Sequence, residues 1–386
     1  MAELYSLPDG WEWKTIEELC EILDRLRKPI SQKDRISGEY PYYGATGIVD
    51  YINNYIFDEK LLLIGEDGAK WGANENTAFI AEGKYWVNNH AHIMRPNKEL
   101  VIDSLLIYYL NTTDLMEYIT GATVKKLNQE KLKSINIPLP PLEEQKRIVA
   151  KLDILFEKID KAIALHQKNI DEADIFMESV LNDVFVELNG VYQKRQLDSF
   201  DKKMSSGGTP SRKEKLYWDN GTIDWFSSGE LNQLYTLPSK EKITQLGLEK
   251  TSTKLFSKGT LLIGMYDTAA MKMSILSNDG SCNQAIVGFK SDESELNILF
   301  LKYQLEYLKK DILEQRQGVR QQNLNLSKIK NIEIEYPPLK TQQKVVAYLD
   351  EISNKMEKIK QIQKEKMQSL KALKASILDK AFKGEL

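Results

Sequence analysis

The sequence predicts an α+β protein in which two globular domains alternate with two long helices, arranged as a pseudo-twofold internal repeat. Residues 121–153 align without a gap on residues 318–350 of the 386-residue chain, and 15 of the 33 aligned pairs are identical. In each copy a short apolar strand and a Pro-Pro pair precede a helical pattern of roughly 40 residues. The composition, 42% apolar and 28% charged, is typical of a globular protein.

The repeat sets the expected domain boundaries. It is too long for a solenoid unit, so it indicates two domains, each followed by its own helix. We expect a first globular domain at 1–141, a central helix at 142–188, a second globular domain at 189–338 and a C-terminal helix at 339–386.

Composition excludes several classes of protein. The sequence has no apolar run near the ~20 residues that a membrane helix needs, and its first ten residues lack the pattern of a signal peptide. Cys20 and Cys282 are too few for a disulfide framework, and there is no Cys/His cluster of metal-binding spacing. These features favour a cytoplasmic, reduced protein. The net charge of −3 gives no overall basic signal, so any nucleic-acid binding must come from local patches.

The first half begins with Leu7-Pro-Asp-Gly-Trp-Glu-Trp, a turn before a short amphipathic segment. Aromatic and glycine-rich residues at 40–51 predict short strands with exposed loops, and residues 60–64 (KLLLI) predict a buried strand. Further strands are expected at 85–87, 91–94 and 135–137, with a helix at 103–119 and a polar loop at 121–128.

The second half repeats this order. Thr260-Leu-Leu-Ile-Gly matches Leu61-Leu-Leu-Ile-Gly, and Asn283-Gln-Ala-Ile-Val is matched with Asn89-His-Ala-His-Ile, which makes His90 equivalent to Gln284. A helix at 296–308 and a loop at 317–325 complete the correspondence. The segments between these landmarks differ strongly, so the scaffold is duplicated and the loops have diverged. This pattern favours two sites of one kind that bind different ligands.

The two long helices carry apolar residues at intervals of three and four, which predicts the seam of a helix pair. The expected seam residues are Ile148, Leu152, Leu155, Ile159, Val345, Leu349, Ile352 and Met356. Residues 142–185 contain ten acids and six bases, and residues 339–386 contain eleven bases and six acids. Opposite net charges favour pairing the helices with each other as an antiparallel coiled coil. Gly190 and Gly384 are the expected helix stops.

No catalytic motif is found. The sequence has no phosphate-binding Gly-Lys-Ser/Thr loop, no glycine-rich cofactor loop after a strand and no Asn-Pro-Pro-aromatic motif for adenine methylation. Asp9 and Glu12 are too close in sequence for two separate strands to present them, which argues against a metal nuclease. We therefore expect no catalytic residue, no metal and no cofactor in this chain. The three histidines, His90, His92 and His166, are expected mainly at surface or packing positions.

Basic, polar and aromatic residues in the variable loops are the candidates for a nucleic-acid surface. Lys125 and Lys126 lie in one duplicated loop and Arg316 and Arg320 in the other, where they would reach phosphates. A solvated turn is the alternative reading for each. The complete candidate set is Tyr42, Tyr43, Thr46, Lys70, Trp71, Asn89, His90, Lys125, Lys126, Ser206, Thr209, Arg212, Lys213, Ser227, Ser228, Tyr266, Gln284, Arg316 and Arg320.

Together these motifs resemble the specificity (S) subunit of type I restriction–modification systems, over the whole chain. The resemblance rests on the opening Leu7 motif, the twice-used Pro-Pro-Leu-x-x-Gln block, Ser206-Gly-Gly-Thr-Pro-Ser, Trp225-Phe-Ser-Ser-Gly-Glu-Leu and the terminal Ile377-Leu-Asp-Lys-Ala-Phe-Lys-Gly-Glu-Leu. It implies two target-recognition domains that each read half of a split double-stranded DNA site. It also implies that the helices act as a spacer and as the docking site for two methyltransferase subunits.

The same resemblance implies that S-adenosylmethionine belongs to those methyltransferase subunits and that restriction–translocation subunits join through the assembly. The chain itself would then be a non-catalytic subunit of an adenine methyltransferase and ATP-dependent endonuclease. Two alternatives come from other classes. A fused methyltransferase–nuclease would need the cofactor motif that is missing, and a coiled-coil scaffold that binds only proteins would not need two divergent globular halves.

Overall fold

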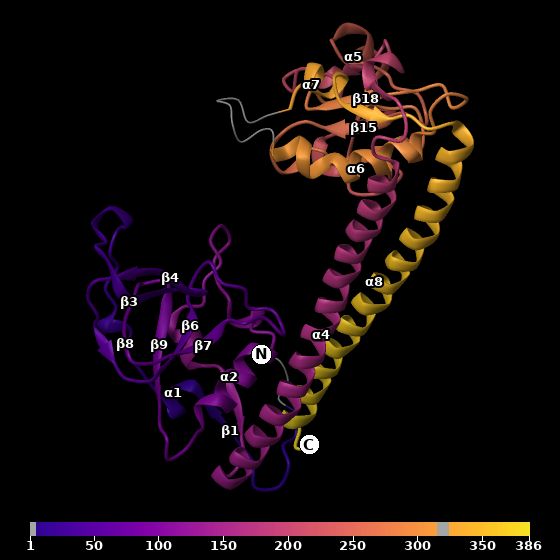
Figure 1. Cartoon of the computed structure of the whole chain (residues 1–386). Coiled ribbons are helices and arrows are strands. Elements are labelled where there is room, and N and C mark those ends of the chain that lie inside the picture. The colour runs from indigo at the N-terminus through magenta and orange to yellow at the C-terminus, as the bar shows by residue number, and fades with distance from the viewer. Residues whose placement is uncertain (1–4, 315–323) are drawn as a thin grey trace. The chain divides into compact units, whose positions relative to one another are not determined.

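The computed structural model describes residues 5–314 and 324–386, which divide into two compact units. Unit 1 comprises Met1–Lys168 and Gln363–Leu386, and unit 2 comprises Asn169–Ile362. Two long helices, α4 (Leu142–Leu188) and α8 (Leu339–Phe382), each contribute one part to each unit (Figure 1). Among the described helices, none combines the length and the low charge that a membrane span requires.

The globular part of unit 1 contains two four-stranded sheets, ordered β2-β9-β6-β7 and β4-β3-β8-β5, and the short pair β1-β10. Its strands are β1 (Glu12–Thr15), β2 (Cys20–Ile22), β3 (Ser37–Gly44), β4 (Gly47–Ile52), β5 (Phe57–Asp58), β6 (Leu61–Gly65), β7 (Ala78–Ala81), β8 (Lys84–Val87), β9 (Ala91–Pro96) and β10 (Asn136–Leu139). Its helices are α1 (Ile16–Leu19), α2 (Asp103–Thr112) and α3 (Gln129–Lys133).

The central strand β6 is buried on both faces because its side chains alternate between two cores. Leu62 and Ile64 join a core with α2 and α4, whereas Leu61 and Leu63 join a core with Tyr85 of the second sheet. Helix α2 therefore packs between the first sheet and the α4 segment of this unit (Figure 1). This helix ends at Thr112, seven residues earlier than the sequence suggested, and the amide of Leu115 donates instead to the carbonyl of Trp71 at 2.8 Å.

Unit 2 repeats this layering with a four-stranded sheet ordered β12-β18-β15-β16, a three-stranded sheet β14-β13-β17 and the short pair β11-β19. Its strands are β11 (Lys194–Gln196), β12 (Ser205–Ser206), β13 (Ile223–Phe226), β14 (Glu241–Ile243), β15 (Leu261–Gly264), β16 (Met273–Ile275), β17 (Ser281–Cys282), β18 (Ile286–Phe289) and β19 (Glu333–Glu335). Its helices are α5 (Gln245–Lys250), α6 (Ile298–Glu314) and α7 (Leu326–Lys330). Leu261 and Ile263 of β15 share a core with α6, and Leu262 faces the second sheet.

Strand pairing corrects one of the predicted equivalences. Ile64 pairs with His92 in unit 1, and Ile263, its counterpart in the repeated Leu-Leu-Ile-Gly segment, pairs with Val287 in unit 2. His92 therefore corresponds to Val287, and His90 corresponds to Ala285 rather than to Gln284. The sequence match of the two Asn-x-Ala segments was displaced by one residue, which in a strand exchanges the two faces.

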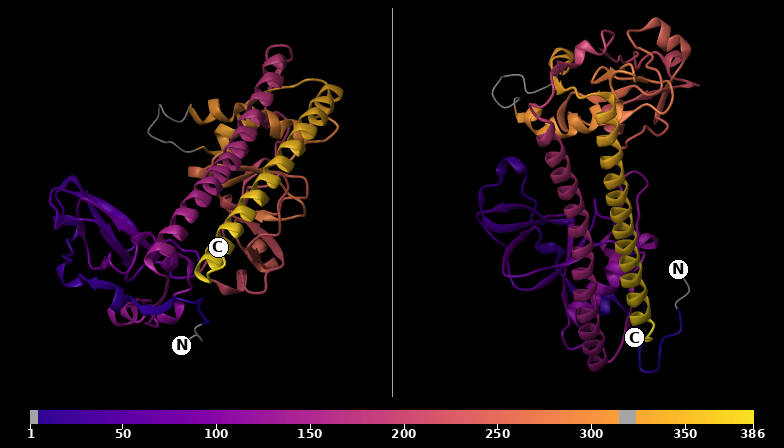
Figure 2. Two further views of the ribbon diagram at one scale, coloured as in Figure 1. Left: turned by 90° about the horizontal axis from the view of Figure 1, so that it is seen from below. Right: turned by 45° about the vertical axis from the view of Figure 1, so that its right-hand side comes forward.

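The two long helices run antiparallel where they meet inside each unit, as predicted (Figure 2). In unit 1, Lys374 of α8 pairs with Asp160 of α4 at 2.9 Å; in unit 2, Lys360 of α8 pairs with Asp174 of α4 at 2.9 Å. Both pairs join an acid of α4 to a base of α8, in line with the opposite helix charges. Gly190 and Gly384 follow the helix ends with positive φ angles of 75° and 73°.

The seam residues have a broader role than helix pairing. Ile148, Leu152 and Ile159 are buried in the same core as α2 and the first sheet, together with Leu378 and Phe382 of α8. Leu349 is likewise buried in the core of unit 2 with α6, where Val345 and Ile352 pack at its edge. Leu155 packs at the edge of the unit 1 core, and Met356 is half-buried. The ends of the long helices are thus parts of the globular cores.

A duplicated pair of buried glutamines fixes each globular domain to its long helix. The Gln145 amide accepts from the backbone N–H of Ile102 at 2.9 Å and donates to the carbonyls of Leu100 and Pro140 at 2.8 and 2.9 Å. Gln342 repeats these bonds with Asn297 at 2.9 Å and with the carbonyls of Glu295 and Pro337 at 3.3 and 2.9 Å. This repetition shows that the duplication extends to buried side-chain geometry.

A second duplicated contact adjoins each glutamine. The hydroxyl of Tyr108 on α2 donates to Asp153 on α4, and the hydroxyl of Tyr303 on α6 donates to Asp350 on α8 at 2.6 Å. Burial and the facing aspartate raise the pKa of both tyrosines, so each hydroxyl stays protonated and acts as the donor.

Candidate nucleic-acid interface

Four loops of unit 1 meet beside the end of β6 and form what we call loop surface 1: residues 44–47, 65–71, 88–91 and 120–127. The backbone of Glu66 joins two of the others, since its N–H donates to the carbonyl of His90 and its carbonyl accepts from Leu127, both at 2.8 Å. A Cβ atom at Gly65 would lie 2.7 Å from the carbonyl oxygen of Ala45, so only glycine permits this approach of the 44–47 loop.

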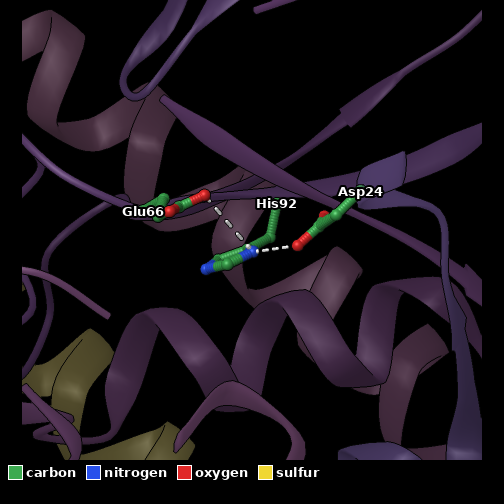
Figure 3. A group of neighbouring side chains, drawn as sticks. All are labelled: Asp24, Glu66 and His92. Carbon is green, nitrogen blue, oxygen red and sulfur yellow. Dashed lines mark hydrogen bonds and ion pairs between the residues drawn. The ribbon is translucent and has the colours of Figure 1, made fainter. Parts of the chain in front are cut away.

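Beneath these loops lies an ionic cluster of Asp24, Arg27, Glu66, His92 and Lys126. The carboxylate of Glu66 accepts from the Arg27 guanidinium and, at 2.6 Å, from the Lys126 ammonium. Asp24 lies 3.4 Å from Arg27 and 2.6 Å from Nδ1 of His92, which lies 3.7 Å from Glu66 (Figure 3). Arg27 also donates to the carbonyl of Ala91 at 2.9 Å. The cluster therefore ties the 120–127 loop to the 88–91 loop.

The hydrogen bonds of the cluster set its charges. Nε2 of His92 faces the carbonyl oxygen of Leu127 and Nδ1 faces the Asp24 carboxylate, both at 2.6 Å, so both ring nitrogens lie against acceptors. Burial acts to raise the pKa of Asp24, but the bond from His92 and the neighbouring donors lower it overall. Burial likewise opposes ionisation of Glu66, and Lys126 and Arg27 outweigh it, so its pKa is lowered too. Both acids are carboxylates at neutral pH.

Asp24, Glu66 and His92 resemble a metal-ligand set, because their donor atoms lie within 4.8 Å of one another. Their donor atoms are already occupied by groups of the chain. Glu66 holds two cationic side chains, Asp24 also accepts from the N–H of Ile93 at 3.0 Å, and both ring nitrogens of His92 are engaged. The cations of this site are Arg27 and Lys126, which makes it an ion-pair network.

The structure sorts the candidates of unit 1 into two groups. Thr46, Lys70, Asn89, His90 and Lys125 are exposed on loop surface 1. Tyr42 and Trp71 are buried, and their polar atoms bond to the backbone: the Tyr42 hydroxyl accepts from Ile30 N–H at 2.8 Å and Trp71 Nε1 donates to Gly65 at 3.0 Å. Tyr43 is half-buried against Phe79 and Tyr85. Tyr42 and Trp71 thus support the loops from beneath and are not exposed as surface contacts, whereas Tyr43 keeps part of its side chain at the surface.

Two candidates of unit 1, His90 and Lys126, are bound to acidic side chains of the same unit. The exposed ring of His90 bonds to Asp67, and the Lys126 ammonium is held by Glu66. Among the residues that the structure describes, Lys125 has no hydrogen-bond or ion-pair partner. Lys125 is therefore an exposed cation of this loop without a partner among the described residues.

Unit 2 presents a corresponding surface with different side chains, loop surface 2: residues 205–215, 227–230, 265–266 and 283–285. Met265 makes the backbone bonds of Glu66: its N–H donates to the carbonyl of Ala285 at 2.9 Å, and its carbonyl accepts from Leu324 at 3.2 Å. The side chain of Met265 is buried in an apolar core with Val287. The positions of Glu66 and His92 are thus apolar in unit 2.

Aromatic residues fix the basic loop of unit 2. The Arg212 guanidinium lies 3.9 Å from the ring centre of Trp218 and pairs with Glu241, with one bond at 2.8 Å. Trp225 is buried, and its Nε1 donates to the carbonyl of Gly208 at 2.9 Å. Arg212 is thus a paired cation beside the exposed Lys213, which has no partner among the described residues. Unit 1 shows the same arrangement in Lys126 and Lys125.

The remaining candidates of unit 2 are placed as follows. Thr209 is exposed and its hydroxyl bonds to the exposed side chain of Gln284. Ser227 caps the turn 228–230 through Glu230, and Ser206, Ser228 and Tyr266 are half-buried. Arg316 and Arg320 lie outside the described residues. Sequence reasoning missed Asp24, Arg27, Glu66 and Glu241. The available signal was a pair of titratable residues beside apolar strand segments, Glu66 after LLLIG and His92 within AHIM.

Comparison with known proteins decides the family. The model of the type I restriction modification DNA specificity domain matches the chain twice, at residues 8–173 and 190–366. The chain belongs to this family. The two matches correspond to the two copies of the repeat.

Relatives in this family span almost the whole chain. A specificity subunit of a type I restriction enzyme from Haemophilus influenzae, S.HindORF215P, is 31% identical over 360 residues, 88% of this chain and 86% of its own length. The MjaVIII specificity subunit of Methanocaldococcus jannaschii is 23% identical over 406 residues, 96% of this chain and 92% of its own.

Solved structures share the fold of this specificity-subunit family. A chain from a study of complex assembly and conformational transition of the type I R-M system has a TM-score of 0.74 at 21% identity, covering 99% of this chain and 100% of that one. The HsdS subunit of Thermoanaerobacter tengcongensis has a TM-score of 0.50 at 21% identity, covering 100% and 99%. The fold is therefore the two-domain, two-helix architecture predicted above.

Proposed function

We propose that this chain is the DNA-reading subunit of a type I restriction–modification complex and that it reads a split site with one domain per half-site. Residues 1–141 and 189–338 would each hold one half-site, against loop surface 1 and loop surface 2. The observation that carries this proposal is the contrast between the buried junctions, which repeat bond for bond, and the loop surfaces, which do not. A duplicated scaffold with different loops suits two readers of different sequences.

On each surface we propose separate roles for the exposed lysines and for the exposed polar side chains. Lys125 and Lys213 are proposed phosphate contacts, because their charges are exposed and have no partner among the described residues. Thr46, Asn89, His90, Thr209 and Gln284 are proposed to face base edges, since amide, imidazole and hydroxyl groups match the donors and acceptors of the major groove.

We propose that α4 and α8 space the two domains and dock two adenine-methyltransferase subunits, which carry S-adenosylmethionine; restriction subunits would join through the assembly. In this assignment the chain contributes no catalytic group. Its free cysteines are in keeping with this role: Cys20 and Cys282 are buried, and burial raises the pKa of each thiol to about 12.

The experiment that tests the proposal is methylome sequencing of a host that carries the methyltransferase gene, with and without the gene for this chain. We expect a single bipartite motif with methylated adenines, present only when both genes are present. A motif that persists without this chain, or one that is continuous rather than split, contradicts the proposal.

A further inference from the structure

Among the residues that the structure describes, the ionic cluster of unit 1 is not repeated in unit 2, where Met265 and Val287 take the positions of Glu66 and His92. Glu66 and Met265 occupy the same place in the fold. The backbone N–H of each donates to a carbonyl in the loop before the neighbouring strand. The backbone carbonyl of each accepts from the residue that precedes a short helix capped by asparagine. Met265 adds only apolar packing. The Glu66 carboxylate adds bonds to Arg27 and Lys126, which the shared backbone arrangement does not require.

Glu66 connects the loops that carry the candidate DNA contacts. Its backbone bonds to His90 and Leu127, its side chain holds Lys126, and Arg27, which it also holds, bonds to the carbonyls of Asn89 and Ala91 at 3.4 and 2.9 Å. Asn89 is itself bonded through its carbonyl, and Lys125 directly precedes the held Lys126. A displacement of the carboxylate would therefore move proposed base contacts and the proposed phosphate contact together.

The cluster also holds a charge away from DNA. The Lys126 ammonium is bound at 2.6 Å to the buried carboxylate of Glu66. Loss of that carboxylate would release Lys126 to the surface beside Lys125. An unpaired lysine binds phosphates of any sequence, which raises non-specific affinity and adds no discrimination.

We propose that Glu66 is a positioning residue for sequence reading by loop surface 1, which it achieves by fixing the 88–91 and 120–127 loops and by keeping Lys126 out of phosphate contact. The inference rests on the proposed function of that surface. It predicts that the two half-sites depend differently on buried charge: the half-site read by unit 1 requires the carboxylate, and the half-site read by unit 2 does not.

The test uses the complex of this chain with its methyltransferase partner and three kinds of duplex: the site found by methylome sequencing, the same site with one base pair changed in either half, and an unrelated sequence. The variant is Glu66→Gln, which keeps the volume and removes the charge. The matched control is Glu59→Gln, which removes an acid that pairs with Arg95 at 2.7 Å near the opposite end of β6 and β9.

For Glu66→Gln we expect discrimination at the unit 1 half-site to fall about tenfold, the scale of one lost bidentate base contact. Discrimination at the other half-site should not change. The salt dependence of binding to the unrelated duplex should steepen by up to ~0.9 in log–log slope, because Lys126 is released. A residue that only stabilises the fold would weaken binding to every one of these duplexes and would not steepen that slope. Glu59→Gln should match the parent in every measurement.

A second variant keeps the inference testable if Glu66→Gln does not fold. Lys126→Met should leave the salt slope of the parent unchanged, since the ammonium is held by Glu66, whereas a slope reduced by ~0.9 would show a phosphate contact and contradict the inference. Parental discrimination in a folded Glu66→Gln complex would also overturn it, as would equal losses at both half-sites. A wild-type complex that discriminates at neither half-site contradicts the proposed function, and the inference with it.

Discussion

Loop surface 1 and loop surface 2 are built on the same backbone and stabilised by different chemistry. Glu66 and Met265 make equivalent backbone hydrogen bonds, yet the first sits in a network of ion pairs and the second in an apolar core. The paired cations differ as well: Lys126 is held by a buried carboxylate, and Arg212 by Trp218 and the exposed Glu241. The backbone hydrogen bonds are thus common to both surfaces, and the side chains beneath them differ.

The junctions between domain and helix show the opposite behaviour, because their side chains are kept. Gln145 and Gln342 are both completely buried and satisfy three backbone groups each. A glutamine amide supplies one acceptor and two donors in a fixed plane, which few other side chains can match. Substitutions at the fixed junctions should therefore have larger effects than substitutions on the divergent loop surfaces.

The largest effect is expected at the junctions. Gln145→Met and Gln342→Met keep the side-chain volume but leave a buried N–H and two carbonyls without their partner. Each should destabilise its own unit by at least about 3 kcal/mol, because three buried groups lose their partner at ~1–3 kcal/mol each. Hydrogen exchange would measure this at the amides of Ile102 and Asn297. If a single substitution reduced hydrogen-exchange protection in both units, the two junctions would not be independent of each other.

A smaller effect should separate the exposed lysines from the paired cations. Lys125→Ala and Lys213→Ala should each reduce the salt slope of DNA binding by up to ~0.9, with unchanged thermal stability. Arg212→Ala should instead lower the thermal stability of unit 2, since the guanidinium packs on Trp218 and pairs with Glu241. Binding measured from low to high salt, together with thermal unfolding, distinguishes them. A normal slope in the lysine variants would remove both residues from the interface.

The smallest expected difference between the two loop surfaces is in their stability at acid pH. The pKa values of Asp24 and Glu66 are lowered in the folded chain, so both stabilise it above the ordinary carboxyl range near pH ~4 and lose this effect as the pH falls through their lowered values. Met265 and Val287 do not titrate. Protection of the Glu66 and Leu127 amides should therefore decline below about pH 4.5 before that of Met265 and Leu324. If both pairs of amides lost their protection over the same pH range, the ionic cluster would not stabilise loop surface 1 in this way.

Sequence predicted the features that repeat or that depend on periodicity. The Pro-Pro-Leu-x-x-Gln block located both junctions and both long helices, and the charge difference between the helices predicted their pairing, seen in Asp160–Lys374 and Asp174–Lys360. What it could not predict were contacts between loops distant in the chain. Nothing near Glu66 in sequence indicates that Arg27 and Lys126 converge on it, and nothing near Trp71 or Tyr42 shows that their polar atoms bond to the backbone.

The most direct test of the account is a chimaera in which residues 1–141 are replaced by the equivalent domain of another family member, beside the native methyltransferase. Both junction glutamines are then retained, so the replacement changes loop surface 1 and leaves loop surface 2 in place. Methylome sequencing should show a new sequence in one half of the methylated motif and the original sequence in the other. A motif altered in both halves, in a chimaera that still methylates, would contradict the claim that each domain reads its own half-site.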